Sequence, residues 1–126
     1  MIKYTRTGLL VVAGLLAAQT GASAAGAVAV GTCDRNGYSY SYANAALAQA
    51  RALSECASNG DQRCRIVVNT RGNCGAFAVD AANRCGARGW AVAPNRRRAE
   101  RLAVDACSGY GGRNCQVKAW TCDGGP

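Results

Sequence analysis

Short segments that are apolar or that alternate apolar and polar residues recur along the chain, and six of them have the length and composition of β-strands. The runs at 27–30 and 76–79 are apolar throughout, which is typical of short buried strands. A glycine-containing turn leads from each of them to a second run, and the last run of each set is rich in Val, Ile and Trp. The pattern predicts strands at 27–30, 38–42, 65–70, 76–79, 89–93 and 116–121.

Two alanine-rich segments repeat their apolar residues every three or four positions, which predicts helices. Ser41 is the expected N-cap of a helix over 42–57, and Asn95, after Pro94, is the expected N-cap of the second helix. The expected buried faces consist of Ala46, Leu47, Ala50, Leu53 and Ala57 in the first helix and of Ala99, Leu102, Ala103 and Ala106 in the second. Because alanine is small, both helices should lie close to what they cover.

The cysteines reveal an internal repeat with a period near 51 residues. Cys33, Cys56, Cys64 and Cys74 match Cys85, Cys107, Cys115 and Cys122 at offsets of 52, 51, 51 and 48. Tyr38 and Trp90 each follow the first cysteine of their quartet by five positions. We therefore expect a single domain over 25–126 made of two repeats, about 25–75 and 76–126. Each repeat reads strand, strand, helix, strand, which predicts an α+β fold of mainly antiparallel sheet with two helices.

The first 24 residues have the composition of a signal peptide. Lys3 and Arg6 precede an apolar run at 8–18, and the small residues at 22–24 fit a cleavage site after Ala24. The apolar run, about 11 residues, is shorter than the roughly 20 that a membrane-spanning helix needs. We therefore expect a secreted or periplasmic protein with no membrane span after cleavage.

Eight cysteines in an exported chain of this size favour four disulfides and an oxidising compartment. The spacing favours Cys56–Cys64 and Cys107–Cys115, because each pair would join a helix end to the next strand across a short loop. The remaining cysteines would then pair as Cys33–Cys74 and Cys85–Cys122. Alternatively, strands exchange between the halves and pair Cys74 or Cys85 elsewhere.

Three sequence motifs stand out in the repeats. They are Cys74-Gly75-Ala76-Phe77-Ala78-Val79, then Gly89-Trp90, and an alanine-rich helix that ends in cysteine and precedes Cys64-Arg65-Ile66-Val67-Val68 or Cys115-Gln116-Val117. In these motifs the chain resembles the bacterial domain of unknown function 4189 family. The resemblance covers nearly all of the chain after residue 24 and implies an exported bacterial domain, without catalytic residues to carry over. Cys33 and Cys85 look like additions to the family's usual three cysteines per half, which implies a structural role for them.

Residues for the common catalytic mechanisms are sparse. The chain has no histidine, which excludes Ser-His-Asp and Cys-His nucleophile pairs. Its cysteines are spaced more widely than those of four-cysteine zinc sites. Among its 7 acidic residues, Glu55 and Asp105 directly precede helix cysteines and Glu100 lies near Arg96 and Arg101, which favours solvated or ion-paired surface. We expect no enzyme activity, no metal and no cofactor, and a carboxylate-based hydrolase is the remaining enzymatic alternative.

An arginine cluster is the first candidate for binding. It opens the second helix, where positive charge opposes the helix dipole, and consists of Arg96, Arg97, Arg98 and Arg101. The cluster is either solvated surface or a contact for an anionic partner. Removal of Lys3 and Arg6 from the 15 basic residues leaves 13 against 7 acidic ones, a net charge of +6 that favours anionic partners.

Three tyrosines are the second candidate. Tyr38, Tyr40 and Tyr42 alternate with serines along a predicted strand, so they share one side of it. If that side faces water, it is an aromatic binding platform. If it faces the helix, it is core, and this is the interpretation that we favour.

Two functions follow from these features. The first is a non-enzymatic, disulfide-rigid module that binds a protein partner, as an inhibitor, an immunity protein or a host-interaction protein does. The alternative is a cationic protein that binds anionic envelope polymers through the arginine cluster together with Arg84 and Arg88. Nucleic acid is not an expected ligand, because no known nucleic-acid-binding module is present.

Overall fold

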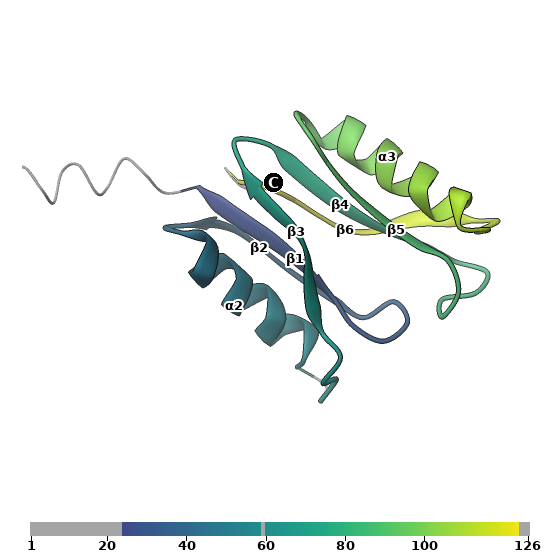
Figure 1. Ribbon diagram of the computed structural model, residues 1–126, viewed down its shortest axis with the longest axis horizontal. Helices are drawn as coiled ribbons and strands as arrows, with labels where there is room; N and C mark the ends of the chain where they lie inside the picture. The colour runs from purple at the N-terminus through teal and green to yellow at the C-terminus, as the bar shows by residue number, and fades with distance from the viewer. Residues whose placement is uncertain (1–23, 59, 124–126) are drawn as a thin grey trace, which may run out of the picture.

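The computed structural model describes residues 24–58 and 60–123 and shows two three-stranded antiparallel sheets between two helices (Figure 1). Its strands and helices are β1 (Ala25–Val30), β2 (Asn36–Tyr42), α2 (Ala45–Cys56), β3 (Arg65–Arg71), β4 (Cys74–Asp80), β5 (Arg88–Ala93), α3 (Arg96–Gly109) and β6 (Cys115–Cys122). The predicted α+β class with two units of strand, strand, helix, strand is confirmed. Apart from Ala24, the predicted signal peptide lies outside the described residues. Within those residues, neither helix has the length and hydrophobicity that crossing a membrane requires.

Each half of the chain forms one sheet with its first strand in the centre. The strand orders are β2-β1-β3 and β5-β4-β6, and β1 and β4 are buried along their whole length. In β1, the three alanines at 25, 27 and 29 pack against α2, whereas Val28 and Val30 pack against the other sheet. A central strand covered on both faces has no polar side, which explains the unbroken apolar runs in the sequence.

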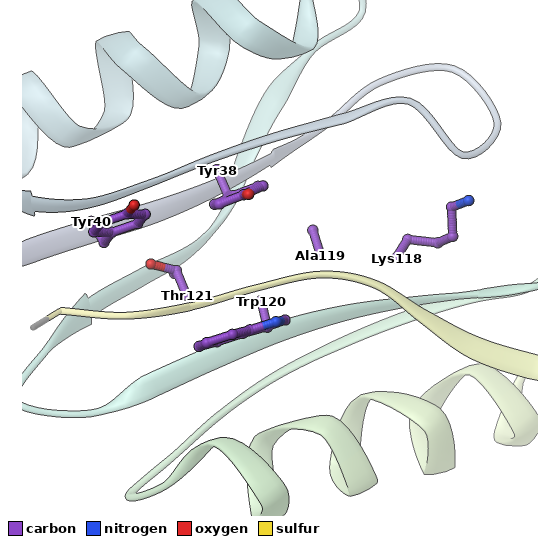
Figure 2. Close-up of a pocket in the computed structure, with 6 residues that line it drawn as sticks. All are labelled: Tyr38, Tyr40, Lys118, Ala119, Trp120 and Thr121. Atoms are coloured by element: carbon purple, nitrogen blue, oxygen red, sulfur yellow. The ribbon is translucent and has the colours of Figure 1, made fainter. Parts of the chain in front are cut away.

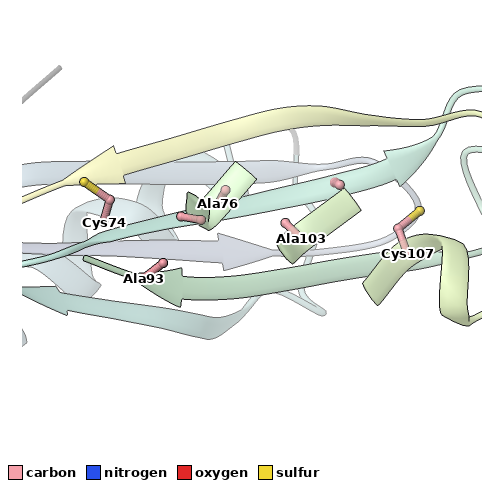
Figure 3. Packing of buried hydrophobic residues seen from close by; sticks show 7 residues of the cluster. Cys74, Ala76, Ala93, Ala103 and Cys107 are labelled. Carbon is pink, nitrogen blue, oxygen red and sulfur yellow. The ribbon is translucent and has the colours of Figure 1, made fainter. Parts of the chain in front are cut away.

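The second half repeats this alternation. Cys74, Ala76 and Ala78 of β4 pack against α3, and Figure 3 shows this cluster between the strands and the helix. Phe77 and Val79 point the other way, into the layer between the two sheets. The result is a four-layer arrangement of helix, sheet, sheet, helix, in which the larger apolar side chains lie between the sheets.

Two glycines in matching positions let each helix lie directly on its sheet. Gly37 of β2 lies opposite the α2 backbone at Ala52 and Cys56, and an added Cβ atom would overlap it. Gly89 of β5 lies in the same way against the α3 backbone. The close approach explains why the buried helix faces consist of alanine and cysteine.

The start and the buried face of the first helix differ from the prediction. Asn44, not Ser41, is the N-cap, and its side chain accepts a hydrogen bond of 2.9 Å from the Leu47 backbone N–H. The buried residues are Ala48, Ala52 and Cys56, and Leu47 is exposed. Of the predicted face, Leu53 is half-buried against this core, whereas Ala46, Ala50 and Ala57 are exposed, so the buried face is rotated from the predicted one.

The second helix follows its prediction more closely. Asn95 is the N-cap, and its side chain accepts a hydrogen bond from the Arg98 backbone N–H. Ala99 and Ala103 are buried as expected, but Leu102 is 38% exposed. Cys107 completes the buried face instead.

Two of the four predicted disulfides are wrong. Cys56–Cys64 and Cys107–Cys115 join each helix end to the next strand as expected. The other bridges are Cys33–Cys85, which links matching positions of the two halves, and Cys74–Cys122, which links the first and last strands of the second half. The predicted pairs Cys33–Cys74 and Cys85–Cys122 do not form, because Cys74 begins β4 beside the end of β6 rather than ending the first half.

Candidate functional site

The edge strands β2 and β6, one from each sheet, are joined where the two sheets meet. The Thr121 hydroxyl donates a hydrogen bond of 2.6 Å to the Ser39 carbonyl, and the Ser41 N–H donates one of 3.0 Å to the Asp123 carbonyl. Beside these bonds lies a hollow of about 160 Å³ (Figure 2). Its lining comes from both strands and consists of Tyr38, Tyr40, Lys118, Ala119, Trp120 and Thr121. We call it the tyrosine groove.

A bulge in β2 decides which tyrosines reach the groove. The pairing with β1 shifts by one residue between Ala25 and Ala27, and Ser41 there adopts a left-handed backbone with φ of 61°. One extra residue in a strand turns the next side chain to the opposite face. Tyr42 therefore packs with the core beneath α2, and Tyr38 and Tyr40 remain on the side of β6.

The interpretation of the tyrosines as core is wrong for Tyr38 and Tyr40. Their exposed fractions are 44% and 41%. The side facing the helix belongs to Ser39, which is buried and whose hydroxyl donates a hydrogen bond of 2.6 Å to the Ala48 carbonyl in α2. A serine fits there because the helix lies too close for a tyrosine.

Behind the groove, Trp120 joins β6 to the arginine cluster. Its ring leaves β6 on the side opposite the tyrosines and packs against the core beneath α3 (Figure 2). The Arg96 guanidinium lies 3.6 Å from the ring centroid, within the range of a cation–π interaction, and its Nε is 3.0 Å from Glu100 Oε1. All four arginines of the cluster are exposed, and of these Arg96 is the one in contact with Trp120 and Glu100.

The structure does not bring Arg84 and Arg88 to the arginine cluster. Both lie where β5 begins, and α3 starts beyond its other end, about 20 Å away at roughly 3.3 Å per residue. Arg84 lies 3.8 Å from an oxygen of Asp34. Arg88 donates hydrogen bonds of 2.7 Å to the Gly31 carbonyl and 3.3 Å to the Cys33 carbonyl. The cationic residues form two separate groups.

The family model for a domain of unknown function, DUF4189, matches residues 25–122. The chain belongs to this family. The match spans every strand and both helices. No curated protein and no solved structure matches the chain.

The carboxylates of this DUF4189 chain hold loops together. Backbone N–H groups of Thr32 and Arg63 donate to Asp61 and lower the pKa of its carboxyl. Asp80 accepts from the backbone N–H of Ala82, then of Arg113 and Asn114, which likewise lowers its pKa. A general acid needs a raised pKa, so these two groups act as structural acceptors.

Among the described residues, the cysteines and acidic residues form neither a free thiol nor a metal-binding cluster. All eight cysteines are paired in disulfides, so a thiol nucleophile would first require reduction. Over residues 24–58 and 60–123, no three Cys, Asp or Glu side chains are grouped so as to hold a metal ion.

Sequence reasoning missed the β6 side of the tyrosine groove. Lys118 and Thr121 were not candidates, because nothing local shows that β6 lies beside β2. A usable signal was the pair of Thr70 and Thr121, which lie 51 positions apart, the period of the repeat, near the end of each third strand. Both threonines are buried, whereas threonine is mostly exposed in proteins.

Proposed function

We propose that this chain is an exported, non-enzymatic binding module that engages a protein partner through the tyrosine groove. The observation that carries the proposal is the exposure of Tyr38 and Tyr40 on a strand held to α2 on one side and to β6 on the other. Exposed tyrosines on rigid backbone are typical of interface hot spots, since they provide contact area at a small cost in entropy.

The size of the groove favours a protein partner over a small ligand. Sites for small molecules usually measure about 300–1,000 Å³, and the groove measures about 160 Å³. That volume suits one inserted side chain of a partner. The net positive charge of the chain favours an acidic surface around that side chain.

Export is part of the proposal and has two supports. Four disulfides require an oxidising compartment to persist, and the first strand begins at Ala25, directly after the predicted cleavage site. We place the protein in the periplasm or outside the cell, as an inhibitor, an immunity protein or a host-interaction protein. The bridges limit the loss of chain entropy on binding.

A matched control makes the groove testable. Val92 lies two residues after Trp90 in β5 as Tyr40 lies two residues after Tyr38 in β2, and the exposed fractions of Val92 and Tyr40 are 42% and 41%. Oxidised protein would be used to capture binders from the envelope and culture fluid of its own cells at low and high salt. We expect one protein, retained at high salt, to be lost with Tyr38→Ala and with Tyr40→Ala but kept with Val92→Ala. Retention by all three variants would remove the groove as the site.

A polyanion-binding function is the second candidate, and the exposure of Arg97, Arg98 and Arg101 favours it. Since Arg96 is engaged with Trp120, the test replaces only Arg97, Arg98 and Arg101 with serine. Binding of an anionic envelope polymer should fall steeply with salt and disappear in that variant. This function would be favoured over the first if only polymer is captured, if salt releases it, and if Tyr40→Ala does not change its binding.

A further inference from the structure

A second hollow, of about 410 Å³, lies at the end of the molecule where the two halves are bridged. Its lining includes the Cys33–Cys85 disulfide and the residues at the end of β1. Three arginines from different segments line it. They are Arg63, which precedes β3, Arg65, the first residue of β3, and Arg88, the first residue of β5. We call it the arginine hollow.

Two of these guanidinium groups are held in place by contacts within the protein. Arg88 uses Nη1 for its hydrogen bonds to the Gly31 and Cys33 carbonyls and keeps its other N–H groups for a ligand. The Arg65 guanidinium lies over the Trp90 ring, 5.2 Å from the centroid. A ligand would therefore meet oriented donors and would immobilise few side chains.

The positive charge of the hollow has no acidic counterpart in its lining. Among the described residues, the ion pairs within 4 Å involve other basic groups, at Arg35, Arg51, Arg84, Arg96 and Lys118. The two nearby carboxylates are already engaged. Asp34 lies near Arg84 and Lys118, and Asp61 accepts from two backbone N–H groups and faces Arg35.

We propose that the arginine hollow binds a phosphate ester. Guanidinium forks bind the oxygens of phosphate in bidentate fashion, and three positive charges suit a doubly charged group better than a single carboxylate. The volume lies within the range of small-molecule sites and leaves room for an organic group beyond the phosphate. The ester is either a soluble molecule or a lipid headgroup, since both present the same group.

Calorimetric titration of the oxidised protein with inorganic phosphate and with glycerol 3-phosphate tests the soluble source. Co-sedimentation with phosphatidic acid vesicles, against phosphatidylcholine vesicles, tests the headgroup. We expect saturable binding of one phosphate group per chain. Arg63→Gln and Arg65→Gln, both at exposed positions, should each weaken it about tenfold or more. Arg71→Gln, at the far end of β3, is the matched control and should leave it unchanged.

Each outcome decides the proposal. Binding of glycerol 3-phosphate that depends on Arg63 and Arg65 supports a soluble ester, and the same dependence with phosphatidic acid vesicles alone supports a headgroup. Absence of saturable binding to all three probes overturns the proposal. It is also overturned if Arg71→Gln weakens binding as much as Arg65→Gln does, because the attraction would then be diffuse charge. Tyr40 does not line the arginine hollow, so Tyr40→Ala should leave phosphate binding unchanged. Failure of the phosphate proposal can therefore be told apart from failure of the proposed protein-binding function.

Discussion

The Thr121 hydroxyl donates a hydrogen bond of 2.6 Å to the backbone carbonyl of Ser39 and so connects the two sheets beside the tyrosine groove. Thr70 occupies the matching position at the end of β3 and is also buried, but its hydroxyl has no hydrogen-bond partner among the described residues. The two halves have the same fold but differ at this polar contact. The hydroxyl of Thr121 therefore joins β6 to β2, whereas that of Thr70 makes no such connection for β3.

The two threonines should respond in opposite ways to replacement by valine, which keeps the shape and removes the hydroxyl. Thr121→Val should lower the free energy of unfolding by about 1–2 kcal/mol, because a hydrogen bond is lost. Thr70→Val should leave it unchanged or raise it by up to about 1 kcal/mol, because a buried hydroxyl without a partner is removed. Urea unfolding of the oxidised proteins measures both. Equal destabilisation by the two changes would contradict the asymmetry.

The Cys33–Cys85 bridge should open first under mild reduction. Cys85 is exposed and Cys33 is half-buried, whereas each of the other bridges contains one buried cysteine, namely Cys56, Cys74 or Cys107. Access to a sulfur atom governs the rate of exchange with an added thiol. Brief treatment with reductant, alkylation and peptide mapping should therefore label Cys33 and Cys85 before the rest.

Opening this bridge should also lower stability. It closes a sequence separation of 52 residues, which corresponds to about 4 kcal/mol in the chain-entropy description. The variant with Cys33→Ser and Cys85→Ser should show this loss in urea unfolding while its far-ultraviolet spectrum stays that of the native protein. Recovery of a peptide that links Cys33 to Cys74 would show that the bridge pattern is different.

The strands and one helix start were predictable because their signals are local. Apolar runs gave β1 and β4, and Asn95 after Pro94 marked the start of α3. The short bridges, such as Cys56–Cys64, followed from the same local order of helix, loop and strand. Each of these features depends on residues close together in the chain.

The features that were missed depend on how distant segments pack. The bridge between Cys33 and Cys85 exists because the sheets face each other, and no spacing within one half encodes that. Tyr38 lies exposed in the hollow between β2 and β6, two strands far apart in the chain, and Tyr42 turns inward because of the bulge at Ser41. Periodicity alone gives both tyrosines the same side.

The glycine contacts beneath the helices allow a sharp test of the packing. Gly37→Ala places a methyl group against the α2 backbone and should cost about 1–3 kcal/mol of stability or more. Gly109→Ala, in the last turn of α3, meets no atom within 4 Å and should raise stability by roughly 0.5–1 kcal/mol through helix propensity. Thermal or urea unfolding compares the two. A neutral Gly37→Ala would mean that α2 lies farther from β2 than the structure has it.

Acid should destabilise the protein partly through Asp80. Hydrogen bonds from the Ala82, Arg113 and Asn114 backbones lower the pKa of this carboxyl in the folded state. The stability that they contribute is therefore fully present above the unfolded pKa, about 3.9, and is lost as the pH falls through the lower folded pKa. Asp61 acts in the same direction through Thr32 and Arg63.

Urea unfolding at a series of pH values between about 5 and 2 measures this loss. Asp80→Asn removes one of the two carboxyls whose pKa is lowered by folding. The variant should therefore be less stable than the unchanged protein at pH 5, and its stability should fall less steeply with acid. If the Asp80 variant loses stability with acid as steeply as the unchanged protein, the contacts between Asp80 and the loop before β6 do not stabilise the ionised carboxylate.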